Sequence, residues 1–139
     1  MDPTPSPGRA TAEAAVRDLV SRASEHQNHP DELLALHTEE AVVVNIAGVR
    51  VAGREEFGDV MRRSLQGRLS DVRTRVEISD VTFLRPDVTL VSCVKHVDDT
   101  NPDADAAALP LTGALTYVVV DDGVGWRIAL AQTTPRAVA

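Results

Sequence analysis

The sequence contains few cysteine, lysine and aromatic residues. Cys93 is the only cysteine among 139 residues, which excludes an internal disulfide and any zinc site built from several thiolates. Lys95 is the only lysine, so arginine supplies all the other positively charged side chains. Aromatic residues make up 3% of the chain, and the hydrophobic core must therefore be built mainly from Val, Leu, Ile and Ala.

Long hydrophobic runs and excess positive charge are also absent. No apolar stretch approaches the ~20 residues of a membrane-spanning helix, and residues 1–8 lack the basic and apolar regions of a signal peptide. Lys and Arg number 14 against 21 Asp and Glu, a formal net charge of −7 that disfavours binding to phosphate backbones. We therefore expect no membrane partner, no nucleic-acid partner and a cytoplasmic location.

Motifs for nucleotides, redox cofactors and acyl-enzyme chemistry are missing. There is no Gly-rich phosphate loop, no G-x-G-x-x-G after a strand and no G-x-S-x-G elbow, so no cofactor is predicted. His26 and His29, followed by Asp31, form the only metal-like spacing. Because this pair spans a predicted helix end and Pro30, we interpret it as an exposed connection and expect no metal.

Hydrophobic periodicity predicts helices followed by strands. Residues 1–10 are proline-rich and are expected to form a disordered tail, whereas apolar residues recur at helical spacing from Thr11 onward. Helices are expected over about 11–28, from Pro30 and from Gly53, and strands over about 41–46, 72–84, 88–97, 110–120 and 125–134. This order predicts one α+β domain over residues 11–134, a mostly antiparallel sheet with its helices on one face, followed by a tail at 135–139.

The segment Asp98–Leu109 fits neither the helical nor the strand period. It carries four aspartates and no basic residue, and it is long for a hairpin connection. A solvated acidic loop is the simpler interpretation, and a lid over the sheet is the alternative.

The predicted strands hold hydrogen-bonding residues but few acids. Strands 41–46, 110–120 and 125–134 contain no carboxylate, so acid–base chemistry would depend on His37 or His96. Asn45 disfavours a central strand unless its amide has a partner. Cys93 is expected to be a buried, inert thiol.

The stretch His37–Gly48 (HTEEAVVVNIAG), followed by Val51–Phe57 (VAGREEF), resembles the SnoaL-like part of the nuclear-transport-factor-two-like superfamily. It is most similar to the SgcJ/EcaC-type branch. Leu115–Val120 and Gly125–Thr134 resemble the closing hairpin of that branch. The similarity covers about residues 11–134. It implies a cone-shaped fold, in which a curved, mostly antiparallel sheet wraps the N-terminal helices and one end opens to a pocket. It also implies a homodimer through the outer sheet face, with which the two-sided apolar strands agree.

The resemblance further implies a pocket for a small apolar, polyketide-derived molecule, with cofactor-free cyclase or isomerase chemistry. Met61 stands where many such relatives carry a histidine, and a methionine cannot transfer a proton. His37 and His96 are the candidate catalytic residues, and the expected ligand-binding residues are Asn45, Met61, Thr116, Gln132 and Trp126. An interaction module that uses the sheet face, with a vestigial pocket, is the alternative.

Overall fold

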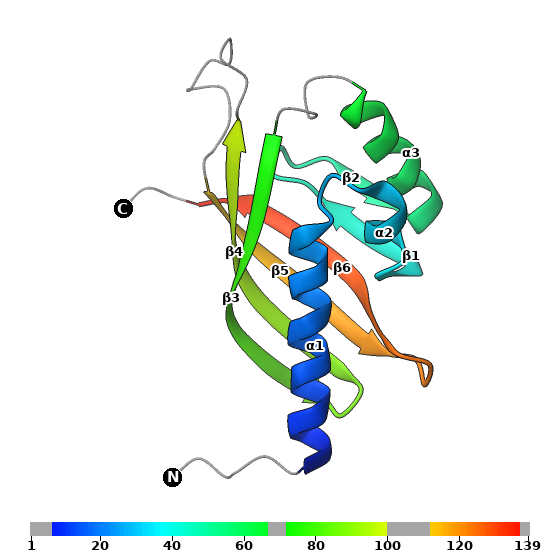
Figure 1. Ribbon diagram of the computed structural model, residues 1–139, viewed down its shortest axis with the longest axis vertical. Helices are drawn as coiled ribbons and strands as arrows, with labels where there is room; N and C mark the ends of the chain where they lie inside the picture. Colours follow the sequence, from blue (N-terminus) through cyan, green and yellow to red (C-terminus); the bar gives the residue numbers. More distant parts are fainter. Residues whose placement is uncertain (1–6, 67–71, 100–111, 137–139) are drawn as a thin grey trace.

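The computed structural model describes residues 7–66, 72–99 and 112–136. In these ranges, three helices and six strands follow one another (Figure 1): α1 (Pro7–Glu25), α2 (Pro30–Leu34), β1 (His37–Val44), β2 (Arg50–Ala52), α3 (Arg54–Leu65), β3 (Val72–Arg85), β4 (Val88–Asp99), β5 (Thr112–Asp121) and β6 (Trp126–Pro135). The strands form one sheet in the order β2-β1-β6-β5-β4-β3. All neighbours are antiparallel except β1 and β6. The predicted α+β class is thereby confirmed.

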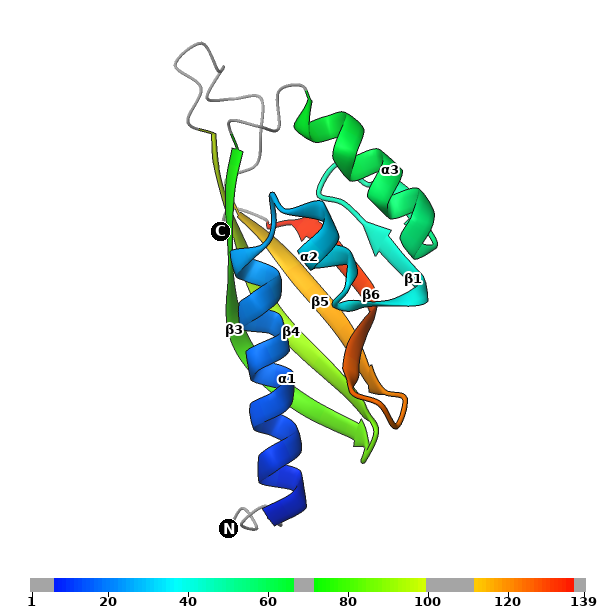
Figure 2. The same cartoon turned by 45° about the vertical axis from the view of Figure 1, so that its right-hand side comes forward.

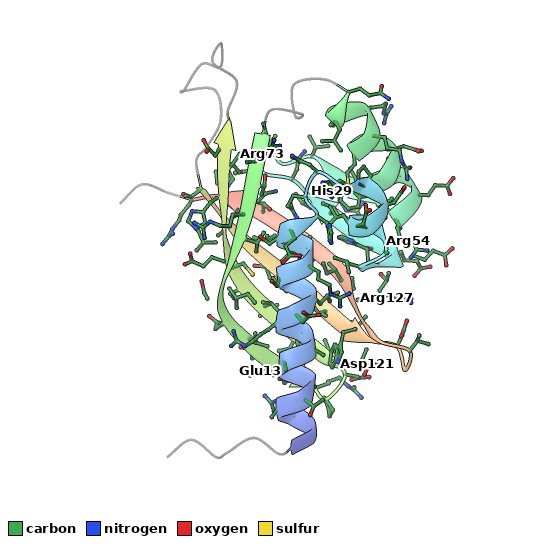
Figure 3. The ribbon with its side chains drawn as sticks, viewed as in Figure 1. Glu13, His29, Arg54, Arg73, Asp121 and Arg127 are labelled. Carbon is green, nitrogen blue, oxygen red and sulfur yellow. The ribbon has the colours of Figure 1, made fainter. Side chains whose placement is uncertain are left out.

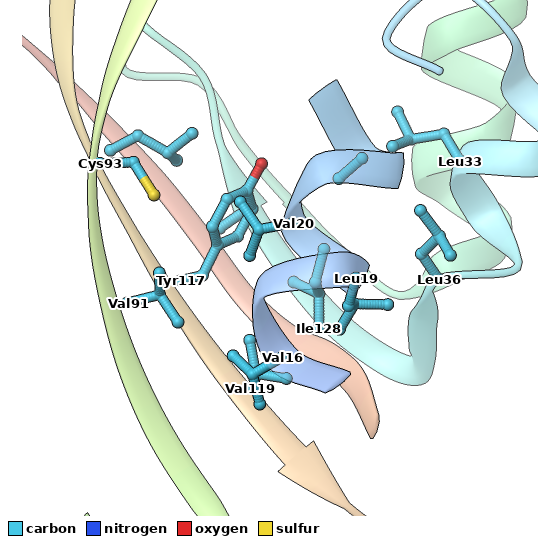
Figure 4. Close-up of a cluster of buried hydrophobic side chains, with 13 residues drawn as sticks. Val16, Leu19, Val20, Leu33, Leu36, Val91, Cys93, Tyr117, Val119 and Ile128 are labelled. Atoms are coloured by element: carbon cyan, nitrogen blue, oxygen red, sulfur yellow. The ribbon is translucent and has the colours of Figure 1, made fainter. Parts of the chain in front are cut away.

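The three helices lie on one side of the sheet, whose long strands curve around α1 (Figures 1 and 2). The buried face of α1 consists of Val16, Leu19, Val20 and Ala23, each at most 1% exposed, as their helical spacing predicts. They pack against inward side chains of the sheet such as Val91, Val119 and Ile128 (Figure 4). Burial of each large apolar side chain stabilises the fold by about 1.5–3 kcal/mol. No helix in the described part of the chain is long and apolar enough to cross a bilayer.

Helix α1 begins earlier than the sequence indicates. It starts at Pro7, so residues 7–10 belong to the helix and not to the expected tail. Proline is tolerated in the first helical turn, where its missing N–H would have no partner. The Arg9 guanidinium lies 4.0 Å from the centre of the Phe83 ring, a cation–π contact that holds this turn against β3. Residues 1–6 lie outside the described residues.

The first strand is also displaced from its expected position. β1 begins at His37 and ends at Val44, so Asn45 follows the strand and starts a turn. That turn leads into β2, a strand of three residues that is too short to be recognised by periodicity. Gly53 then adopts a φ of 97° at the start of α3, a backbone conformation that favours glycine.

A β-bulge divides β6 into two parts. Val118 pairs with Leu130 while Val119 pairs with Ile128, so Ala129 has no partner on β5. Ile128 faces the core on one side of this bulge, and Ala131 and Thr133 face inward on the other side. Because of the bulge, an even-numbered residue of β6 points inward on one side of Ala129 and odd-numbered residues point inward on the other side.

Candidate functional site

A cavity of about 320 Å³ lies at the end of the molecule where α1 ends. Its walls are the inner faces of the longer strands and the facing side of α3. Most of the lining side chains are Val, Leu, Ile, Ala, Phe and Met, and the size is that of a small-molecule site. Among its polar lining residues, His37, Tyr117 and Thr133 are buried, and those that are half-buried are Gln27, Asn28, Ser64, Thr74 and Lys95.

Helix α3 forms the apolar wall opposite the sheet. Its amphipathic spacing directs Phe57, Met61 and Leu65 inward, with Val60 and Ser64 beside them. Glu55 and Glu56 stand in the first turn and Arg62 and Arg63 in the last, as the helix dipole favours. The predicted inner stripe of this helix is confirmed, and Met61 lines the cavity.

His37 is the buried imidazole of the cavity. It is 2% exposed at the start of β1, and its Nδ1 lies 2.8 Å from the carbonyl oxygen of Leu33. Because a carbonyl can only accept, Nδ1 donates this hydrogen bond, and the neutral ring carries its lone pair on Nε2. The ring meets Phe57 edge-on, with 5.2 Å between centres.

The surroundings of His37 keep its ring neutral. Burial lowers its pKa below the ordinary 6.5, the hydrogen bond to Leu33 opposes this, and the Arg54 guanidinium lowers the pKa further. Arg54 stands at the start of α3 beside β1 (Figure 3) and donates a 3.2 Å hydrogen bond to the His37 carbonyl oxygen. At neutral pH, Nε2 can therefore accept a proton or a hydrogen bond.

Tyr117 and Thr133 add hydroxyl groups from the sheet. Both face inward and are at most 5% exposed. The hydroxyl of Tyr117 points away from Val16 and Val119, toward the end of the molecule at which α1 ends (Figure 4). Burial raises the pKa of Tyr117, so its hydroxyl stays protonated and can donate to a ligand.

Lys95 is a cavity residue that the sequence analysis missed. It lies on β4 between the inward residues Cys93 and Val97 and lines the cavity. Burial lowers the pKa of its ammonium group. Its alternation with Cys93 and Val97 was a usable signal, because both neighbours are apolar and predict an inward-facing strand position.

Asn45 lines the rim of the cavity but serves the turn after β1. Its Oδ1 accepts hydrogen bonds of 3.0 Å from the backbone N–H groups of both Ala47 and Val49. The partner that the sequence required for this amide is therefore local backbone. Asn45 is exposed, and only its Nδ2 remains to contact a ligand.

Four of the expected site residues do not line the cavity. Thr116 and Gln132 pair with each other across β5 and β6 on the outer face of the sheet, because Leu115, Tyr117 and Thr133 occupy the inward positions. His96 also faces outward, with Nε2 3.6 Å from a Glu77 carboxylate oxygen. Trp126 lies at the opposite end of the cone, edge-on to Phe83 with 6.2 Å between ring centres.

Two other features contribute little chemistry. Cys93 is 5% exposed, and burial together with the Asp80 carboxylate raises its pKa to about 12, as expected for an inert thiol. Within residues 7–66, 72–99 and 112–136, no three His, Cys, Asp or Glu side chains gather closely enough to hold a metal ion. Of the acidic segment, Asp98 and Asp99 belong to β4 and the remainder lies outside the described residues.

This fold and cavity define a protein with a cystatin-like fold. A domain of unknown function from Nostoc punctiforme with that fold superimposes with a TM-score of 0.80, at 19% identity over 92% of this chain and 79% of that chain. Sequence then gives the family: residues 14–133 match the SnoaL-like domain, and the chain belongs to this family. No curated protein matches the chain at the level of sequence.

Two further solved structures share the fold and carry functional descriptions. One, from Novosphingobium aromaticivorans, is described as a candidate scytalone dehydratase (TM-score 0.71, 18% identity, 95% of this chain and 92% of that chain). The other, from Erwinia carotovora, is described as ketosteroid isomerase-like (TM-score 0.65, 16% identity, 95% and 98%). At these identities the similarity establishes the shared fold alone.

Proposed function

We propose that this protein binds an apolar small molecule in the cavity beside α3 and that His37 accepts a proton from the bound molecule. The observation that carries the proposal is a neutral imidazole in a largely apolar cavity of about 320 Å³. The reaction would be an isomerisation or cyclisation, in which a base removes a proton and the cavity orients the reacting carbons.

The hydroxyl groups of the sheet complete this chemistry. Once His37 takes a proton, negative charge develops on the ligand and requires a donor nearby. Tyr117 and Thr133 line the same cavity and can donate to that charge. No Asp or Glu is among the described lining residues, so the imidazole is the base that this set offers.

The class of ligand follows from the family and the lining. A polyketide-derived compound, polycyclic or polyene in character, suits a lining in which apolar side chains predominate beside several hydrogen-bonding groups. The run His37–Gly48 and the Gly53-Arg54 pair before α3 support placing the chain in the SgcJ/EcaC-type branch, which accompanies natural-product metabolism.

Blocking the cavity tests the binding step. Ser64 lies on α3 in the lining, so Ser64→Phe fills the cavity from a helix surface. Gln66→Phe adds the same ring at an exposed position just after α3 and is the matched control. In calorimetric titrations with polycyclic and polyene compounds, we expect the wild type and Gln66→Phe to bind and Ser64→Phe not to bind.

The catalytic step is tested separately by mass spectrometry of the same mixtures. His37→Gln keeps a hydrogen-bonding side chain at this position but has no group that can act as a base in place of Nε2. We expect it to retain ligand binding and to lose conversion by about 10²–10⁴-fold. Equal conversion by the wild type and His37→Gln would remove His37 from the reaction.

The outer face of the sheet supports a second role, self-association. Val94, Val118 and Leu130 are half-buried on the face that α1, α2 and α3 leave uncovered. Pairing of two such faces would make a homodimer and bury these side chains. Val118→Arg should then halve the mass measured by light scattering, whereas Val124→Arg in the exposed β5–β6 turn should leave the mass unchanged.

A further inference from the structure

In the described part of the chain, the cavity is lined by one lysine side chain and by no carboxylate. Of its lining residues that the structure describes, Lys95 alone carries a formal charge at neutral pH, and none is an acid. Across residues 7–66, 72–99 and 112–136, no carboxylate lies within ion-pair distance of its ammonium group. This is the only lysine of a chain whose net charge is −7.

The residues around Lys95 offer it no compensation. Along β4 its inward neighbours are Cys93 and Val97, which are 5% and 9% exposed. Across the strands its backbone partners are Val76 and Gly113. None of these four residues carries a negative charge at neutral pH. A cation held among such groups loses hydration, and an anion that enters the cavity restores the lost interaction.

We propose that the ligand of this cavity is an apolar molecule that carries one carboxylate group, and that Lys95 binds this carboxylate. The inference deepens the proposed function and rests on it. An ammonium group donates up to three hydrogen bonds, so Lys95 can donate to both carboxylate oxygens, and the hydroxyls of Tyr117 and Thr133 remain for the negative charge that develops elsewhere on the ligand. The apolar lining on α3 would then hold the hydrocarbon part of the ligand.

A change in the protonation of Lys95 on ligand binding provides a second test of the proposal. Burial lowers the pKa of its ammonium group, whereas a bound carboxylate beside it favours the charged form and raises that pKa. Binding of a carboxylate is therefore accompanied by proton uptake at a pH where free Lys95 is partly deprotonated. A neutral ligand produces no such uptake.

The experiment compares matched acids and amides. 2-Naphthoate and anthracene-2-carboxylate are titrated calorimetrically against 2-naphthamide and anthracene-2-carboxamide, which have nearly the same shape without the charge. The proteins are the wild type, Lys95→Met, Lys95→Arg and Arg50→Met, the last removing one positive charge from an exposed position on β2 outside the cavity. Circular dichroism verifies that each variant is folded.

We expect the wild type and Arg50→Met to bind each acid more tightly than its amide by about ten- to a hundredfold, the ratio that a hydrogen bond to a charged group supplies. Lys95→Met should abolish that preference and leave amide binding within about threefold, and Lys95→Arg should retain part of it. Equal wild-type affinity for acid and amide, or a preference that survives in Lys95→Met, overturns the carboxylate inference while the apolar site stands. Binding of neither compound to the wild type overturns the proposed function and the inference with it.

Discussion

His37 combines the two properties on which the proposed chemistry depends: it is buried at the start of β1, and its orientation is fixed by the Leu33 carbonyl. From the sequence alone, His37 and His96 were equivalent candidates. Only the fold distinguishes them, because β1 begins at His37 and turns it inward while the register of β4 turns His96 outward. Two histidines of one chain thus have different chemistry through placement alone.

Burial of His37 makes the stability of the protein depend on pH. At pH 7.5 the ring is largely neutral in both the folded and the unfolded chain, because the ordinary pKa is 6.5 and burial lowers it in the folded state. As the pH falls below 6.5, the unfolded chain binds a proton that the folded state binds less readily, so the free energy of unfolding decreases. His37→Gln should therefore lose less stability than the wild type between pH 7.5 and pH 5.5 in urea denaturation. An identical loss in both proteins would contradict the assignment of His37 as a buried, neutral ring.

Asn45 stabilises the turn between β1 and β2 through its side-chain oxygen. Asn45→Ala removes two hydrogen bonds from backbone N–H groups and should reduce the free energy of unfolding by about 1–2 kcal/mol. Asn45→Asp keeps an acceptor at the same position and should lose less. Chemical denaturation of the three proteins measures both differences, and an Asn45→Ala protein as stable as wild type would show that the turn does not depend on this side chain.

At the scale of the element, the start of α3 depends on the conformation of Gly53. An alanine at a φ of 97° and a ψ of 139° costs about 1–3 kcal/mol, so Gly53→Ala should destabilise the protein by that amount although no atom beyond the adjacent residues lies within 4 Å of the added Cβ. Gly8 is equally open but lies within α1, where alanine is the better helix former. Gly8→Ala should therefore raise the thermal midpoint while Gly53→Ala lowers it, and a shift of the same sign in both would contradict this explanation.

Periodicity identified the long elements well and failed where the strands are irregular. The inner stripes of α1 and α3 follow from their 3.6-residue spacing, and the extents of β3 to β6 follow from their β-branched runs. The inward face of β5 and β6 did not follow, because apolar residues such as Val118 and Leu130 also stand on the outer face of these strands. The bulge at Ala129 has no sequence signal, yet it decides that Thr133 faces the cavity and Gln132 does not.

On the scale of the whole molecule, the core and the cavity share part of their walls, because Leu33, Leu115, Tyr117 and Ala131 belong to both. Leu19 packs in the core from α1 and is not a lining residue of the cavity. Leu19→Ala should therefore destabilise the fold by about 2–5 kcal/mol, since this side chain is 1% exposed. Ligand affinity of the folded fraction should stay unchanged. A large loss of affinity at full folding would mean that core and cavity are coupled.

Residues far apart in the sequence supply the cavity, which explains why only part of it was predicted. His37 and Asn45 lie in the stretch His37–Gly48, Met61 follows the Gly53-Arg54 pair on α3, and all three line the cavity. Lys95 and Tyr117 come from strands whose inward face depends on the register of the whole sheet. Local sequence thus led to the first group, and the three-dimensional pairing of the strands was needed for the second.

Met61 provides the most direct test of the central claim that the cavity binds an apolar molecule, because its methyl group lies on the cavity wall formed by α3. The measurement is a titration with 2-naphthoate, followed by the carbon-13 methyl signal of labelled Met61 in the wild type and in Ser64→Phe. We expect a saturable shift of this signal in the wild type and none in the blocked variant. A Met61 signal that does not move in the wild type, or that moves equally in Ser64→Phe, would contradict a binding site in this cavity.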